Sequence, residues 1–218
     1  MDWKLSKAKL TWLIFILGVV SATGPLSIDL YLPALPQMTK TLNASASLVQ
    51  LSLSACLVGL AVGQLIAGPL SDKYGRKNPL ILGFILFSVI SLMIAFTNSV
   101  TFLIILRFIQ GLAGSAGQVL SRAIARDLFA GPRLTRFYSM QSAVNGIFPV
   151  ISPVIGGFMI RFVNWQGIFI LLAIIGFLIL IGIIFGIQES LPSTQRIAGS
   201  TTKTIFQMFS LSETSASG

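Results

Sequence analysis

The sequence contains no histidine, one cysteine and few charged residues. Only 10% of its 218 residues are charged, whereas 54% are hydrophobic. Because histidine is absent, a Ser–His dyad cannot form around Ser115, although glycines flank the Ser115-Ala116 pair as they flank the nucleophile of serine proteases. No Cys/His cluster exists to bind zinc or haem, and Cys56 lies in an apolar run that indicates nothing about disulfides. The composition therefore argues against an enzyme, and no metal or cofactor is expected.

The shortage of charge also argues against a soluble domain, which usually carries about a quarter charged residues. The charge that is present is unbalanced, with 15 basic and 6 acidic residues and a formal net charge of +9. The bases lie between apolar runs instead of forming one face. The positive-inside rule of membrane proteins therefore explains them better than nucleic-acid binding. Membrane lipid, and not nucleic acid, is the expected partner.

Six apolar segments are long enough to cross a membrane as helices, which takes about 20 residues for roughly 30 Å of hydrocarbon. They are continuous rather than alternating, which favours helices over barrel strands. The segments cover residues 10–32, 47–69, 79–97, 101–121, 137–160 and 167–187. The sequence thus predicts an all-α polytopic membrane protein. Its parts are a cytoplasmic N-terminus at 1–9, a six-helix bundle at 10–189 and a cytoplasmic linker or tail, rich in Ser and Thr, at 190–218.

The first apolar segment also has features of a signal peptide, because lysines precede it and residues 20–22, VSA, fit a cleavage site. Apolar character resumes at residues 24–35, so we interpret the segment as a retained first membrane helix. Counting bases gives the orientation. With a cytoplasmic N-terminus, twelve bases fall on the cytoplasmic side and only Lys40 and Arg161 on the outer side. Both termini are therefore predicted to be cytoplasmic.

Two ionisable side chains lie within the spans, Asp29 in the first and Arg107 in the fourth. A charge at membrane depth costs at least about 2.5–3.5 kcal/mol, so it normally faces a partner or a wet cavity. Both residues are expected in the outer half of the bilayer. Three interpretations stay open: a carboxylate whose protonation depends on what occupies the cavity, a static ion pair between two helices, or an Asp29 shallow enough to be hydrated.

Small residues recur at helical spacing within the spans and predict close helix contacts. Prolines inside two spans predict bends or loosened turns, which are common where helices line a cavity. The small residues are Gly59, Gly63, Gly111, Gly114, Gly117, Gly182 and Gly186, and the prolines are Pro25, Pro149 and Pro153.

Several stretches resemble signatures of the major facilitator superfamily. Residues 68–77, GPLSDKYGRK, resemble its G-x-L-a-D-r-x-G-r-k motif and lie between the second and third spans on the predicted cytoplasmic side. Residues 106–111, LRFIQG, resemble its fourth-helix motif R-x-x-Q-G. The stretch SIDLYLPALP at 27–36, together with SRAIARDL at 121–128, resembles the Bcr/CflA group of drug:proton antiporters. The resemblance covers essentially the whole membrane part.

This resemblance implies the six-helix N-terminal half of a bacterial inner-membrane exporter. Such an exporter exchanges protons for small amphipathic drugs by alternating access, with the proton gradient as its energy source. It implies proton coupling by Arg107 and Gln110 and a cavity-facing acid at Asp29. It also implies a cytoplasmic gating loop and part of a helix-five signature. The loop residues are Gly68, Asp72, Gly75 and Arg76, and the helix-five residues are Pro153, Gly156 and Gly157.

Within the gating loop we expect Gly75 to allow a tight turn. We hypothesise that Asp72 pairs with a base at the inner end of the fourth helix, either Arg122 or Arg126. Such a pair would close the inner gate in the outward-facing state and open on rocking.

The sequence departs from the family in helix five and in length. The remaining glycines of the exporter signature G-x8-G-x3-G-P-x2-G-G are replaced, which weakens the case for export over uptake. Where the family often has Trp-Arg before helix six, this chain has Trp165-Gln166. Members have twelve helices in two halves. We therefore expect a truncated or partial chain that lacks its C-terminal half, or a six-helix unit that pairs with a second one. A metabolite or sugar importer and a non-transporting or channel-like subunit remain alternative functions.

Overall fold

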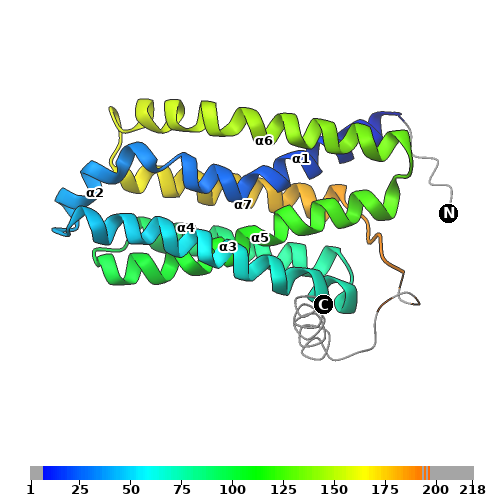
Figure 1. Cartoon of the computed structure of the whole chain (residues 1–218), viewed down its shortest axis with the longest axis horizontal. Helices are drawn as coiled ribbons and strands as arrows, with labels where there is room; N and C mark the ends of the chain where they lie inside the picture. Colours follow the sequence, from blue (N-terminus) through cyan, green and yellow to red (C-terminus); the bar gives the residue numbers. More distant parts are fainter. Residues whose placement is uncertain (1–6, 193, 195, 197–218) are drawn as a thin grey trace, which may run out of the picture.

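The structure, a computed structural model, describes residues 7–192, 194 and 196, and its main feature is a bundle of six long apolar helices (Figure 1). These are α1 Lys7–Asp29, α3 Ala46–Tyr74, α4 Lys77–Ala95, α5 Val100–Leu128, α6 Pro132–Met159 and α7 Trp165–Gly186. A 3₁₀ turn, η1 Leu32–Ala34, and a short helix, α2 Leu35–Thr41, follow α1. The predicted all-α architecture with six apolar helices is confirmed. Most of the predicted tail, 197–218, and residues 1–6 lie outside the described residues.

Three helices extend by five or more residues beyond the apolar runs that predicted them. α3 continues past residue 69 to Tyr74, α5 continues past 121 to Leu128, and α6 begins at Pro132 instead of 137. At 1.5 Å per residue, a helix of 29 residues is about 44 Å long, more than the roughly 30 Å of hydrocarbon. The added turns carry charged residues. Hydropathy therefore marks the apolar part of each helix and misses its polar end.

The first helix ends earlier than predicted. α1 stops at Asp29 instead of 32, and Pro33 and Pro36 lie in the first turns of η1 and α2. Proline lacks a backbone N–H, so it is tolerated in the first turn of a helix but not in its interior. The chain accordingly restarts twice here. α1 and α6 nevertheless run through their internal prolines without interruption.

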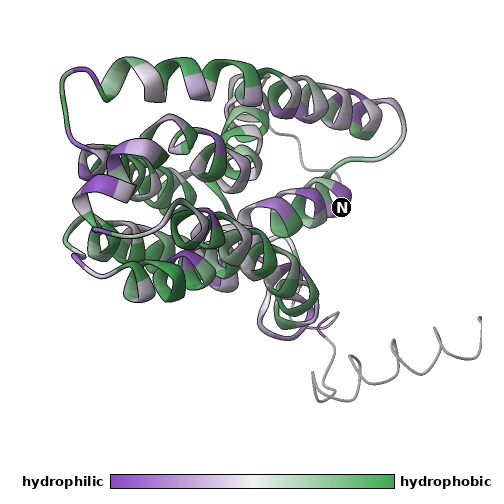
Figure 2. Ribbon diagram, turned by 60° about the vertical axis from the view of Figure 1, so that its left-hand side comes forward, coloured by the Kyte–Doolittle hydropathy of each residue, from purple (hydrophilic) through white to green (hydrophobic). Residues whose placement is uncertain are grey.

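The helices form two layers. α3, α5, α1 and α6 lie side by side in that order, while α4 and α7 pack together as a second layer against α5 and α1 (Figure 1). The start of α1, the α3–α4 loop, the α5–α6 connection and the end of α7 lie at one end, here called the basic end (Figure 1). It carries Lys73, Arg76, Lys77, Arg122, Arg126, Arg133 and Arg136. Hydrophobic residues cover the lengths of the helices, and hydrophilic ones gather toward loops and ends (Figure 2).

Glycines bring α5 into close contact with its neighbours. A Cβ atom on Gly59 of α3 would collide with the carbonyl oxygen of Phe108, and one on Gly111 of α5 would collide with the carbonyl oxygen of Cys56. Gly117 faces a carbonyl of α1 in the same way. Close backbone approach of this kind is typical of membrane helices, whose association has no hydrophobic driving force. The contacts predicted from these glycines are therefore present.

Replacing Gly59 by alanine should destabilise the bundle, because the new methyl group forces α3 away from α5. We expect a loss of about 1–3 kcal/mol in the free energy of unfolding, the usual cost of overpacking. Gly68 on the same helix provides the matched control, since a Cβ there meets no atom within 4 Å. Thermal unfolding of both purified variants in one detergent measures the difference. Equal melting temperatures would contradict the contact.

Candidate functional site

Arg107 is fully buried on α5 and connects three helices. Its Nη1 donates hydrogen bonds to the carbonyl oxygen of Ser27 on α1 (3.2 Å) and to Oε1 of Gln110 (2.6 Å). Nε2 of Gln110 donates to Oγ of Ser91 on α4 (2.6 Å), which in turn donates to the carbonyl oxygen of Phe87. The two polar residues of the R-x-x-Q-G motif therefore join α1, α5 and α4 in one hydrogen-bonded chain.

Two aromatic rings lie against the Arg107 guanidinium. Its central carbon is 4.4 Å from the ring centroid of Tyr31 and 5.6 Å from that of Phe169, distances at which a ring face attracts a cation. The Tyr31 hydroxyl lies 3.0 Å from Oγ of Ser52 on α3. Sequence reasoning left Tyr31 open between packing and substrate binding and gave Phe169 no role. The available signal for Tyr31 was its position two residues after an acid inside a membrane span.

The buried guanidinium is only partly satisfied. Nε and Nη2 of Arg107 have no hydrogen-bond acceptor among the described residues. Unpaired donors in a dry interior cost free energy. These two nitrogens therefore mark a place where an acceptor would be favourable.

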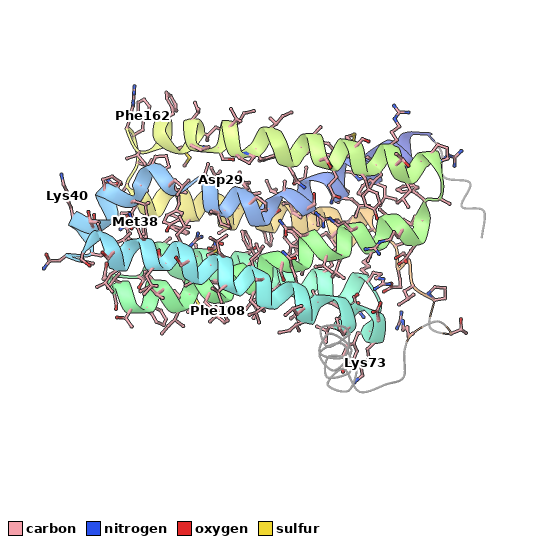
Figure 3. The ribbon with its side chains drawn as sticks, viewed as in Figure 1. Asp29, Met38, Lys40, Lys73, Phe108 and Phe162 are labelled. Atoms are coloured by element: carbon pink, nitrogen blue, oxygen red, sulfur yellow. The ribbon has the colours of Figure 1, made fainter. Side chains whose placement is uncertain are left out.

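Asp29 does not supply that acceptor. It is the last residue of α1 (Figure 3), is partly exposed, and has no salt bridge to Arg107 in the part of the chain that is described. The static ion pair considered from the sequence is wrong for this structure. The reason is rotational: Ser27 presents its carbonyl to Arg107, and Asp29, two residues further along α1, lies about 200° around the helix.

At the basic end, Arg76 contacts two carboxylates. Its Nη1 donates to Oδ1 of Asp72 (2.5 Å) and Oγ of Ser71 (2.6 Å), and its Nε donates to Oδ2 of Asp127 at the end of α5 (3.0 Å). The preceding residue, Gly75, has a φ of +87°, in the left-handed region that favours glycine. The turn expected at Gly75 is present, and it brings Arg76 between α3 and α5.

The expected partner of Asp72 was wrong. We expected Arg122 or Arg126, but the ion-pair partner of Asp72 among the described residues is Arg76, and both α5 bases are exposed. The reason is the turn at Gly75, which ends α3 and brings the side chain of Arg76 back onto Asp72 in the last turn of that helix. The sequence analysis had treated this stretch as a loop.

Glu189, which follows α7, caps the N-terminus of α4. Its Oε1 accepts the backbone N–H of Arg76 (2.8 Å) and its Oε2 accepts that of Lys77 (3.3 Å). A carboxylate is favourable there because it meets unpaired N–H groups and the positive end of the helix dipole. Nζ of Lys77 donates to the carbonyl oxygen of Ile184 in the last turn of α7 (2.8 Å). Sequence reasoning gave Glu189 and Asp127 no role, although acids are so scarce in this chain that any acid near the basic loop was a candidate partner.

The helix-five signature packs α6 against the segment after Asp29. A Cβ on Gly156 would collide with the carbonyl oxygen of Leu30, and one on Gly157 would lie 3.9 Å from Pro33. Pro153, one turn earlier on α6, is partly buried. These residues fix the distance between α6 and the end of α1.

Comparison with known proteins agrees with these motifs. The family model described as Major Facilitator Superfamily matches residues 12–214. The chain belongs to the major facilitator superfamily. Its relatives include the "Uncharacterized MFS-type transporter YdgK" of Bacillus subtilis (strain 168), 47% identical over 91% of this chain and 50% of that protein. A "Bicyclomycin resistance protein homolog" of Haemophilus influenzae is 36% identical over 84% of this chain and 46% of that protein. The "Multidrug resistance protein MdtL" of Vibrio parahaemolyticus is 35% identical over 86% of this chain and 48% of that protein.

Solved structures of the superfamily share the fold. The proton:xylose symporter XylE, bound to 6-bromo-6-deoxy-D-glucose, gives a TM-score of 0.75 at 16% identity, over 85% of this chain and 46% of the symporter. The human organic anion transporter TETRAN gives a TM-score of 0.67 at 17% identity, over 87% of this chain and 50% of the transporter. At these identities the similarity shows the major facilitator fold alone. The chain spans about half the length of the curated relatives it matches.

Replacing Arg76 by glutamine should destabilise the protein more than replacing Arg126 by glutamine. The first change leaves Asp72 and Asp127 without their shared base and should cost about 1–2 kcal/mol, because hydrogen bonds to charged groups are strong but these are partly exposed to solvent. The second removes an exposed side chain and should change stability by less than about 0.5 kcal/mol. Unfolding in a common detergent measures both, and equal losses would favour the Asp72–Arg126 contact instead.

Proposed function

We propose that this chain is the N-terminal six-helix half of a proton-coupled multidrug exporter of the bacterial inner membrane. The observation that carries the proposal is its sequence similarity to the proteins of Haemophilus influenzae and Vibrio parahaemolyticus named for bicyclomycin and multidrug resistance. That similarity extends over 84% and 86% of the chain, far beyond the loop motif. A sugar importer is the competing function, but XylE resembles the chain only at the level of the fold.

Asp29 is the proposed proton-exchanging residue, with Arg107 and Gln110 as its coupling partners. A nearby arginine favours the charged carboxylate, whereas a dry surrounding favours the protonated acid. Asp29 is partly exposed at the end of α1, while the unpaired Nε and Nη2 of Arg107 lie buried beside Ser27. Movement of Asp29 between the partly exposed end of α1 and the buried nitrogens of Arg107 would make it bind and release a proton. Gln110 positions Arg107 for this by fixing its Nη1.

A second six-helix unit is the proposed partner, and two helices have faces suited to it. α3 and α6 are the least buried spans, with 28% and 11% of their apolar windows inside the bundle against 44–67% for the others. Each has a buried face, an exposed apolar face and a third exposed face rich in small and polar residues. The third faces are Gln50, Ser54, Ala61 and Gln64 on α3 and Thr135, Ser139, Ser142, Gly146 and Pro149 on α6. Small residues at this spacing suit helix–helix contacts in membranes.

The substrate is proposed to bind between the two units, as it does where transporters are built from repeats. Gating is proposed at the basic end. There Arg76 connects the α3–α4 turn to α5, and Glu189 connects it to α7, so this end moves as one body during rocking. Asp72 and Arg126 keep exposed surface at this end and are available to the second unit when the inner gate closes.

Replacing Asp29 by asparagine should reduce drug-stimulated proton movement to background, because the amide cannot exchange a proton. The assay uses everted vesicles from cells that produce this chain together with the remaining half of the Bacillus subtilis relative. Asp29→Glu should retain part of the activity, and Lys40→Gln, at an exposed site at the opposite end, should retain all of it. Undiminished proton movement in Asp29→Asn would refute the assignment. Proton movement stimulated by sugars and not by drugs would favour the importer.

The proposed orientation predicts which loops an impermeant thiol reagent reaches. The single cysteine, Cys56, is buried, and Cys56→Ala provides a cysteine-free background. A cysteine placed at exposed Asn98, between α4 and α5, should be labelled in intact cells, because that loop is proposed to be outside. A cysteine at exposed Arg133, at the basic end, should be labelled only after permeabilisation. The reverse pattern would overturn the orientation.

A further inference from the structure

A narrow cleft lies between α3 and α4, with α5 as its floor. Its volume is about 90 Å³. Its walls include Gly63, Ala67 and Leu70 of α3 and Pro79, Gly83 and Leu86 of α4. The cleft exists because α3 and α4 each pack closely on α5 but make few contacts with each other. Gly63 and Gly83 let both helices approach α5, and the space between α3 and α4 stays open beside these contacts.

The cleft suits an apolar occupant. Ser115 is the one polar side chain among its lining residues, and its Oγ already donates to the carbonyl oxygen of Leu112 (2.7 Å). Water in a buried site needs two to four polar partners, and apolar cavities stay dry. In a membrane the abundant apolar material is the acyl chain of a lipid.

The cleft opens on the side of the bundle that faces lipid. The exposed residues of α4 along this side, such as Leu82 and Val89, are apolar, and so are Val58 and Leu65 on the neighbouring face of α3. The small and polar face of α3 is rotated about 150° away from the cleft residues. The opening therefore points away from the face proposed for the second six-helix unit.

The position of the cleft along α3 indicates which leaflet its occupant comes from, and the charge at its mouth indicates the type of lipid. Leu70 lies at the end of the apolar run of α3, and Gly63 lies six residues, or about 9 Å, inside residue 69, so the cleft falls within one leaflet of roughly 15 Å. Lys73 is exposed at this mouth, with its ammonium 5.0 Å from the Tyr74 ring centroid (Figure 3). The neighbouring Arg76 and Lys77 already contact protein oxygen atoms.

We propose that this cleft binds a segment of one acyl chain of an anionic phospholipid from the leaflet at the basic end, with Lys73 attracting the headgroup. The chain completes the packing between α3 and α4, which the protein leaves open. Lipid composition then affects how firmly α3 is fixed beside α4. The inference depends on the cleft and its charge, and it stands whether the protein exports or imports.

Photo-crosslinking in vesicles of phosphatidylglycerol and phosphatidylcholine containing the full chain tests the proposal. The probes are phosphatidylglycerol and phosphatidylcholine, each with a diazirine on one acyl chain. We expect cross-links to concentrate on residues 63–70 and 79–86. Leu86→Trp fills the cleft and should remove most of them, whereas Ile85→Trp, on the neighbouring lipid-facing position outside the lining, should not.

The headgroup is tested separately. Lys73→Gln should lower labelling by the phosphatidylglycerol probe about fivefold, the factor that one basic residue contributes near an anionic surface. It should leave labelling by the phosphatidylcholine probe unchanged. Lys40→Gln, at the opposite end (Figure 3), is the control for loss of one positive charge and should change neither.

Three results would overturn the proposal. Cross-links spread evenly over the exposed faces of α3 and α4 would show ordinary lipid contact, and cleft cross-links that persist in Leu86→Trp would place the chain elsewhere. Cleft residues that cross-link to a second protein copy and not to lipid would assign the cleft to a protein interface. If circular dichroism shows that Leu86→Trp changes the helix content, the smaller filling variant Leu70→Phe replaces it in the same assay, with the same expectation.

Discussion

The close packing of α5 on α3 and α1 determines the rest of the structure. Lipid is as apolar as leucine, so helices in a membrane gain nothing from burying apolar side chains against each other and depend on packing and hydrogen bonds. Glycines let the backbones approach, and this closeness allows Arg107 to reach the carbonyl oxygen of Ser27 on α1. A wider spacing would leave the guanidinium without that acceptor, at a depth where an unpaired charge is costly.

Two arginines organise the half-bundle in different ways, and the difference follows from depth. Arg107, among apolar helices, is surrounded by neutral partners: a carbonyl, an amide and two aromatic rings. Its charge is stabilised without being neutralised, so a carboxylate remains a favourable addition. Arg76, at the polar end, lies between two carboxylates. The first arrangement suits a site that changes its ionic partners, and the second suits a fixed connection between helices.

The sequence was sufficient for the number and type of helices, because a continuous apolar run of about 20 residues has few other interpretations. It was also sufficient for the glycine contacts of α5. It was insufficient for the pairing of charges. Whether Asp29 meets Arg107 depends on a rotation about α1 that hydropathy does not record. Whether Asp72 meets Arg76 or Arg126 depended on the turn at Gly75, which brings Arg76 back onto the end of α3. Glu189 was missed because its partners are backbone N–H groups more than a hundred residues away, and no local pattern reveals them.

The exchange of contacts between α4 and α7 has a consequence for how the protein is made. The N-terminus of α4 is capped by Glu189, which follows α7, and the last turn of α7 is bound by Lys77, the first residue of α4. While α4 enters the membrane during synthesis, the groups that satisfy its end have not yet been translated. These hydrogen bonds therefore form only when the sixth span has been inserted, and the bundle reaches its lowest free energy only then. The unit of assembly is the complete set of six helices, because the α3–α4 hairpin alone lacks the hydrogen-bond acceptors that α4 needs at the basic end.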